Sequence, residues 1–177
     1  MSNADVRRAR SKAVKHFRRK EYRRALPGLR LALQRNTKDY AARFYRALCW
    51  YELGQWKRAL VEWKHLLAIG PHQRNVNLNL GCAYQRLGKS RMAVRSYKKE
   101  LEVNPGCGEA AYNLGALYFK SRRYAQAAAY FERCYILKHC VNEVVERLAH
   151  SYFKTNQLEK EMNLYQECLQ RDARDSW

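Results

Sequence analysis

The sequence predicts an all-α protein made of stacked antiparallel helix pairs, and three observations lead to this prediction. Similar stretches recur 34 residues apart, as in "NLGCAYQRLGK" at 79–89 and "NLGALYFKSRR" at 113–123. Large and small side chains within each stretch are spaced by three, four and seven, which places them on one helix face. Gly and Pro interrupt this pattern at intervals, so each period contains two helices.

The period is visible along the whole chain when residues 34 apart are compared in columns. Small residues let two helix backbones approach closely, and large or aromatic residues three or four positions later fill the space beside them. A single helix pair cannot bury its apolar face alone, so the pairs must stack. The first small column contains Ala13, Ala47, Gly81, Gly115 and Ala149, and the second contains Ala25, Ala59, Ala93, Ala127 and, as an exception, Glu161.

Five periods fit the chain as one domain, and we number these repeats in chain order. In each repeat we expect a first helix, a turn near Gly54, Gly88 or Asn156, and a second helix that stops before residues such as Pro71 or Pro105. The last helix is rich in polar residues and is expected to close the array with a wettable outer face. The predicted repeats are 6–39, 40–73, 74–107, 108–141 and 142–175, with a short N-terminal tail at 1–5 and a C-terminal end at 176–177.

The pattern L-G-x-x-Y, followed by Ala, an aromatic residue and Pro, resembles the tetratricopeptide repeat. The third and fourth repeats match it best, whereas Arg46 departs from it by occupying the Leu column. The resemblance implies a right-handed α-solenoid superhelix whose concave groove is lined by the first helix of each repeat. It also implies a non-catalytic protein–protein interaction module, such as an adaptor, a scaffold or a chaperone-like protein.

Helical spacing selects the residues of each first helix that share the groove face. Aromatic rings supply contact area at low entropic cost, and Lys or Arg select acidic groups, so we expect an acidic partner segment. The alternative is that some of these side chains only bridge neighbouring repeats. The predicted groove residues are Phe44, Tyr45, Tyr51, Asn79, Arg86, Tyr112, Asn113, Phe119, Lys120, Arg147, His150 and Phe153.

Basic charge is concentrated at the start of the chain. The net charge is +19, and the first repeat contributes thirteen basic residues against two acidic ones, whereas the fifth repeat is net acidic. Three interpretations stay open. The basic surface is a docking site for an acidic protein segment, for nucleic acid or for another polyanion; or it is only a solvated face; or it takes part in head-to-tail self-association, in which the first repeat of one chain contacts the fifth repeat of another. The basic patch consists of Arg18, Arg19, Arg23 and Arg24.

Other classes of function lack support in the sequence. We expect no enzyme and no cofactor, because the chain contains no Gly-rich phosphate loop, no G-x-S-x-G and no H-E-x-x-H. No apolar run reaches the ~18 residues that a membrane span requires. The cysteines show no metal-ligand spacing, so we expect no metal site and predict reduced thiols in a cytoplasmic protein. They are Cys49, Cys82, Cys107, Cys134, Cys140 and Cys168.

Overall fold

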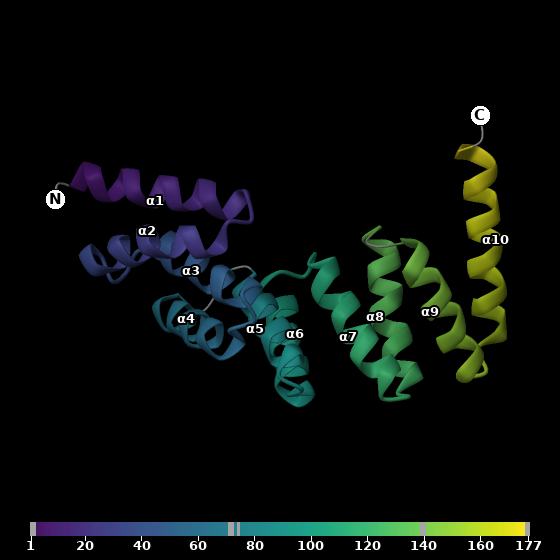
Figure 1. The fold of residues 1–177 in the computed structure, drawn as a ribbon. Coiled ribbons are helices and arrows are strands. Elements are labelled where there is room, and N and C mark those ends of the chain that lie inside the picture. Colours follow the sequence, from purple (N-terminus) through teal and green to yellow (C-terminus); the bar gives the residue numbers. More distant parts are fainter. Residues whose placement is uncertain (1–2, 71–72, 74, 139–140, 176–177) are drawn as a thin grey trace. The chain divides into compact units, whose positions relative to one another are not determined.

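The computed structural model describes residues 3–70, 73, 75–138 and 141–175, and the regular structure of these residues is entirely α-helical, which confirms the all-α prediction. Pro71 and Cys140 lie outside the described residues, as do the chain ends 1–2 and 176–177. Ten helices follow one another in this described part (Figure 1). They are α1 Asn3–Arg18, α2 Tyr22–Arg35, α3 Tyr40–Glu52, α4 Trp56–Ile69, α5 Val76–Arg86, α6 Ser90–Val103, α7 Gly108–Lys120, α8 Tyr124–Ile136, α9 Val141–Lys154 and α10 Leu158–Asp175.

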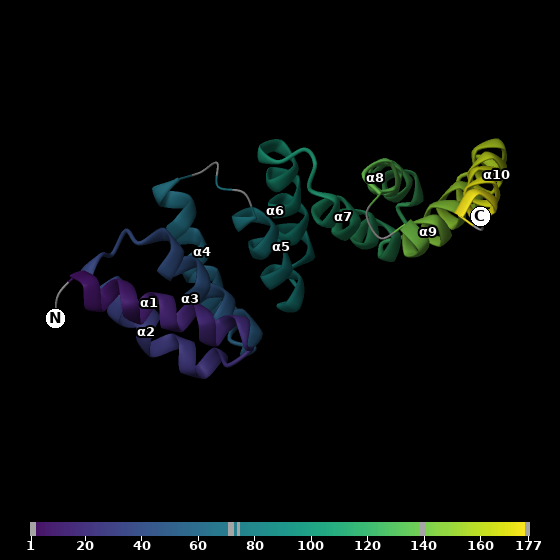
Figure 2. The same cartoon turned by 90° about the horizontal axis from the view of Figure 1, so that it is seen from above.

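The chain divides into two compact parts, which we call the N-terminal half (residues 1–96) and the C-terminal half (residues 97–177). The division falls inside α6. In the N-terminal half, the successive helices from α1 to α5 pack against one another in order, and Figure 2 shows α1 and α2 side by side. In the C-terminal half, α7 to α10 do the same. The division into five repeats within one domain stays a prediction.

The two helices of each predicted repeat are joined by the same tight turn. One residue of the turn has a left-handed backbone, and the next residue donates its N–H to a carbonyl five residues earlier. Glu21 donates in this way to His16, and Arg123 donates to Tyr118, both at 2.9 Å. Such bonds satisfy carbonyls that the helix end leaves without a partner. The left-handed residues recur every 34 positions: Lys20, Gly54, Gly88, Arg122 and Asn156, with φ of 60°, 74°, 70°, 56° and 56°.

The columns found in the sequence form the core of both halves. The alanines of the second small column, Ala25, Ala59, Ala93 and Ala127, are fully buried, as are the large residues four positions later, Leu29, Trp63, Tyr97 and Phe131. At Gly115 a Cβ atom would come within 2.7 Å of the Phe131 ring. The glycine therefore allows the ring to lie directly against α7.

The last helix differs from its expected wettable outer face. Leu158, Met162, Tyr165 and Leu169 are between 48% and 70% exposed. Their spacing of four, three and four residues places them together on one side of α10. The outer surface of α10 therefore combines the predicted polar residues with an exposed apolar stripe.

Candidate partner-binding surfaces

Predicted groove residues of α7 and α9 meet in the C-terminal half. The Tyr112 hydroxyl accepts a hydrogen bond from Arg147 Nη1 at 2.7 Å and donates one to Glu143 Oε2 at 2.5 Å. The Arg147 guanidinium also lies over the Tyr112 ring, 5.2 Å from its centroid. The tyrosine therefore links two helices that are predicted to line the same groove.

An aromatic cluster lies one to two turns further along the same pair of helices. Phe119 contacts His150 at a ring-centroid distance of 5.1 Å, and Tyr124 of α8 contacts both rings at 5.5 and 5.7 Å. Phe153 remains 58% exposed, with the Lys154 ammonium 5.6 Å from its ring centroid. The cluster thus joins predicted groove residues to one residue, Tyr124, that was not predicted.

The remaining predicted residues of this half, Asn113 and Lys120, lie on α7 beside these contacts. Asn113 is half-buried and Lys120 is exposed. Tyr124 and Glu143 are the two contact residues that sequence reasoning missed. A signal for Tyr124 exists, because its column of period 34 reads Tyr22, Trp56, Ser90 and Tyr124 and is aromatic at three of these four positions.

In the N-terminal half, two predicted rings of α3 pack against other aromatic rings. The Tyr45 ring contacts Phe17 of α1 at 5.3 Å and belongs to the apolar cluster around α1 and α2. Phe44 contacts Tyr45 at 6.2 Å and stacks on Tyr40 at 5.9 Å. Half-buried Phe44 and Tyr45 therefore combine a packing role with partial exposure.

Contacts between α3 and α5 are more polar. Tyr51 lies 5.8 Å from Trp63 and accepts a long hydrogen bond from Arg86 Nε at 3.4 Å. The Asn79 amide donates to the carbonyl of Asn75 at 2.7 Å, which engages it with its own helix. Arg86 is exposed, so its guanidinium is the accessible cation of this surface.

The basic patch lies at the junction of α1 and α2, and its four arginines are all exposed. The carboxylate of Glu21 lies among them, with Oε2 at 2.5 Å from His16 Nδ1 and Oε1 at 3.5 Å from Arg24 Nη1. The hydrogen bond from His16, together with the charge of Arg24, lowers the pKa of the Glu21 carboxyl, although desolvation opposes this shift. Glu21 therefore stays ionised within a strongly basic surface.

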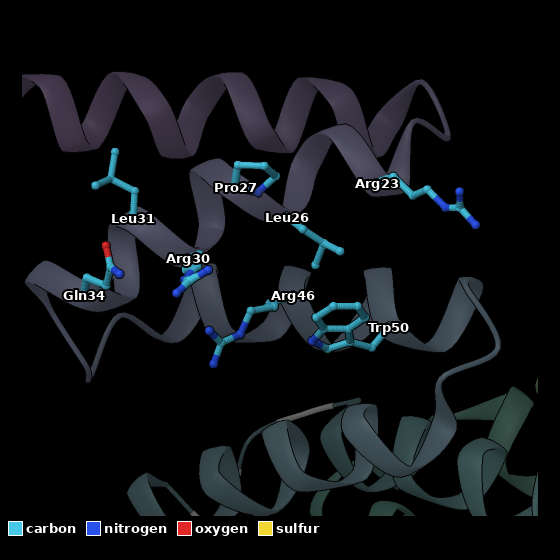
Figure 3. Close-up of a pocket in the computed structure, with 8 residues that line it drawn as sticks. All are labelled: Arg23, Leu26, Pro27, Arg30, Leu31, Gln34, Arg46 and Trp50. Carbon is cyan, nitrogen blue, oxygen red and sulfur yellow. The ribbon is translucent and has the colours of Figure 1, made fainter.

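A hollow of about 590 Å³ opens between α2 and α3, and we call it the α2–α3 hollow (Figure 3). Figure 3 shows Leu26 and Trp50 pointing toward one another, while Arg23 extends outward near the start of α2. Arg23 is its only lining residue among the predicted site residues. The hollow is lined by Arg23, Leu26, Pro27, Arg30, Leu31, Gln34, Arg46 and Trp50.

A second hollow, of about 360 Å³, lies in the C-terminal half between α8, α9 and α10. Inside it, Glu132 accepts hydrogen bonds from Tyr152 at 2.7 Å and from Lys160 at 3.2 Å. Burial raises the pKa of the Tyr152 hydroxyl, and the hydrogen bond to Glu132 and the negative charge of that carboxylate raise it further. The hollow is lined by Glu132, Tyr135, Ile136, Leu148, Tyr152, Lys160, Asn163, Leu164 and Glu167.

Metal and membrane features are not found in the described part of the chain. The described residues contain no group of three or more His, Cys, Asp and Glu side chains that could hold a metal ion. No helix among them is long and apolar enough to cross a membrane. The five described cysteines are thiols, and burial raises the pKa of Cys49 to about 11.

Comparison with protein families gives matches over most of the chain. Residues 11–64 and 78–137 match one model described as a tetratricopeptide repeat, and residues 143–175 match a second model with the same description. No curated protein matches the chain in sequence.

Solved structures resemble the chain in fold. The crystal structure of a protein named MamA aligns with a TM-score of 0.82 at 12% identity, over 97% of this chain and 93% of that one. A structure of MamA from Desulfovibrio magneticus RS-1, which covers residue 41 to the end of that protein, aligns with a TM-score of 0.80 at 14% identity over 98% of each chain. A thermophilic TPR protein of Thermus thermophilus gives 0.66 at 23% identity, over 96% of this chain and 93% of that one. At these identities the likeness concerns the fold alone.

Proposed function

The chain belongs to the tetratricopeptide repeat family, and on this premise we propose that it is an adaptor or scaffold that binds an acidic segment of a partner protein through its groove residues. Repeats of this family are non-catalytic modules for protein–protein interaction. A protein partner therefore follows from the family. The acidity of the partner and the residues that bind it are the content of the proposal.

The contacts between α7 and α9 are the observation that carries the proposal. Tyr112 with Arg147, and Phe119 with His150, join the first helices of two successive repeats through side chains predicted to face one groove. Aromatic side chains held by neighbours on both sides are typical of binding hot spots, since little entropy is lost when they engage a partner.

The preference for acidic groups is supported by the cations near these rings. Lys120 and Lys154 are exposed at the ends of α7 and α9, and Arg147 is half-buried against Tyr112. Glu143 is the acidic residue that contacts the Tyr112 hydroxyl. With a net charge of +19, the whole chain also attracts acidic partners over longer distances.

The proposal is tested by capture from native lysate with the tagged chain as bait, with and without nuclease, followed by mass spectrometry. We expect the same acidic proteins in both samples. Capture that disappears after nuclease treatment contradicts the proposal, because nucleic acid is then the ligand.

The basic patch supports a second candidate function, which is binding of nucleic acid or another polyanion. Arg18, Arg19 and Arg23 are exposed cations at the α1–α2 junction. If phosphates bind there, the affinity falls steeply with salt, with a log–log slope that reports several released counterions. A groove contact made by aromatic rings weakens much less. Head-to-tail self-association between the basic first and acidic fifth repeats is distinguished from both by sedimentation equilibrium without any ligand.

A further inference from the structure

The α2–α3 hollow is built on one continuous face of α2. Its six α2 residues follow one another at spacings of three, one, three, one and three, which is the spacing of a single helix face. Arg23 and Arg30 stand two turns apart on this face, and Leu26 and Pro27 lie between them. Trp50 of α3 lies opposite Leu26 (Figure 3). The hollow therefore has an apolar centre between two cations.

The cations of the hollow exceed the anions that neutralise them. Arg23 and Arg30 are exposed and form no ion pair with any residue that the structure describes. Arg46 binds Glu62 at 2.6 Å, but Arg43 binds the same carboxylate at 3.1 Å, so one anion serves two guanidinium groups. The Nε–H of Arg46 is also buried without an acceptor among the described residues. The hollow thus retains uncompensated positive charge.

The repeat itself provides an internal reference for this charge. Four residues that line the second hollow stand three periods after residues that line the α2–α3 hollow, and in the second hollow the carboxylate of Glu132 accepts hydrogen bonds from both Tyr152 and Lys160. The described residues that line the α2–α3 hollow include no carboxylate that could pair with its cations. The equivalent residues of the second hollow are Glu132 for Arg30, Ile136 for Gln34, Leu148 for Arg46 and Tyr152 for Trp50.

We propose that the α2–α3 hollow binds an acidic amphipathic helix of a partner protein, with two carboxylates seven residues apart and an apolar side chain between them. The carboxylates pair with Arg23 and Arg30, which are separated by two turns, or about 10.5 Å along the helix axis. The apolar side chain enters between Leu26 and Trp50. This site lies outside the groove residues and does not rest on the proposed function of the groove.

The lining favours a peptide over a phosphate backbone. Leu26, Pro27, Leu31 and Trp50 provide apolar contact that a phosphodiester cannot use, whereas a side chain of Leu or Met can. A helical ligand fits because a helix lying along α2 repeats its side chains at the same pitch, as in other complexes in which a helix occupies a groove. Arg can hold each carboxylate with two parallel hydrogen bonds.

The test uses a synthetic helical probe peptide with Glu at two positions seven residues apart and Leu at the third and fourth positions between them. Binding to the full chain is measured by fluorescence anisotropy. We expect Arg23→Gln with Arg30→Gln to weaken binding at least about tenfold. The matched control, Arg18→Gln with Arg19→Gln, removes the same charge from exposed residues outside the hollow and should change affinity less than about twofold. Equal losses in both variants overturn the proposal, because the general field of the first repeat then explains binding.

Two further experiments test the spacing of the peptide's carboxylates and the location of the binding site on the chain. A peptide of the same composition with its Glu residues five apart should bind weakly, and a Lys-containing peptide should bind the charge-reversed variant Arg23→Glu with Arg30→Glu. Equal binding of both Glu peptides to the unaltered chain overturns the proposal. Tyr112→Ala with Phe119→Ala should leave probe binding unchanged. If it abolishes binding while the arginine variants bind normally, the ligand sits in the groove, which overturns this site and favours the groove.

Discussion

Arg46 of α3 donates a hydrogen bond from Nη2 to Oε1 of Glu62 in α4 at 2.6 Å, so a cation in a column that holds Leu in the last three repeats is held by a buried carboxylate of the next helix. Arg43, one turn earlier, binds the other oxygen of Glu62 at 3.1 Å. The side chains of Arg43 and Glu62 are each only 12% exposed. The three charges therefore form a network that depends on its single carboxylate.

Removing that carboxylate should destabilise the protein more than removing one of its partners. For Glu62→Gln we expect a loss of about 3 kcal/mol in the free energy of unfolding, because two partly buried guanidinium groups lose their anion. For Arg46→Leu, which introduces the residue that this column holds in the last three repeats, we expect a change within about 1 kcal/mol in the free energy of unfolding, since apolar replacement of a buried ion pair is often neutral. Urea unfolding followed by circular dichroism measures both. A larger loss for Arg46→Leu contradicts this account.

The left-handed turn residues give a second prediction about stability. Lys20 and Arg122 have φ of 60° and 56°, where a side chain costs about 1–2 kcal/mol and glycine costs nothing. Because glycine adds about 0.5–1 kcal/mol of backbone entropy to the unfolded chain, Lys20→Gly and Arg122→Gly should each stabilise by about 0.5–1 kcal/mol. Gly88→Ala should instead destabilise by about 1 kcal/mol. Chemical denaturation checks all three, and a destabilised Lys20→Gly variant disproves the strain argument.

The groove hypothesis predicts that Tyr112→Ala with Phe119→Ala abolishes capture of the partner while the chain remains folded. Loss of a hot-spot ring typically costs ~2 kcal/mol or more of binding free energy. Tyr112→Phe is the matched control, since it keeps the ring and removes only the hydroxyl that bonds Arg147 and Glu143. Capture and thermal melting are measured together. Intact capture with melting lowered by several degrees shows that the rings only join neighbouring repeats.

The basic patch predicts a separation between binding and stability. Replacing Arg18, Arg19, Arg23 and Arg24 with Gln should leave the helical signal and the melting temperature nearly unchanged, because exposed charges contribute little to stability. Binding of heparin, used as a polyanion probe, should fall, and its salt dependence should become shallower. Unaltered binding in a low-salt titration identifies the patch as a solvated face.

Burial of Cys49 predicts an unusual pH dependence of its reactivity. Its pKa is raised from about 9 to about 11, so at pH 8 the thiolate fraction in the folded chain is on the order of one in a thousand. Because the folded pKa is the higher one, the associated stability is present below pH 9 and is lost as the pH rises toward 11. Alkylation by iodoacetamide, followed by mass spectrometry, should be slower at Cys49 than at half-buried Cys168. Equal rates at pH 8 contradict the assigned burial.

Much of the fold could be predicted from the sequence because the period records helix packing directly. The small columns had to be buried wherever two helices touch, and Ala59 and Ala127 are fully buried. The turn between the two helices of a repeat could also be predicted, although only Gly54, Gly88 and Asn156 indicated its position in the sequence. Lys20 and Arg122 adopt the same backbone without any signal in their side chains, because the hydrogen bonds of the turn outweigh the local strain.

The candidate sites were less accessible to prediction. Helical spacing assigns a residue to a face, but it does not say which side chain reaches across to the next helix. The pairing of Tyr112 with Glu143 and the pairing of Arg46 with Glu62 therefore appeared only in three dimensions. The α2–α3 hollow was missed for a related reason: α2 supplies most of its lining, whereas the groove residues were predicted from the first helix of each repeat alone.

The turn of each repeat also decides which kinds of genetic change the protein tolerates. The chain passes from α7 to α8 through three residues, Ser121–Arg123, with fixed hydrogen bonds. Inserting one residue there rotates α8 by about 100° around its axis relative to α7. That rotation would carry Ala127 and Phe131 out of the core, whereas Phe119 and Lys120 precede the insertion. Point substitutions of the predicted groove residues on α7 therefore keep the register between α7 and α8, whereas a single-codon insertion or deletion in the turn changes it.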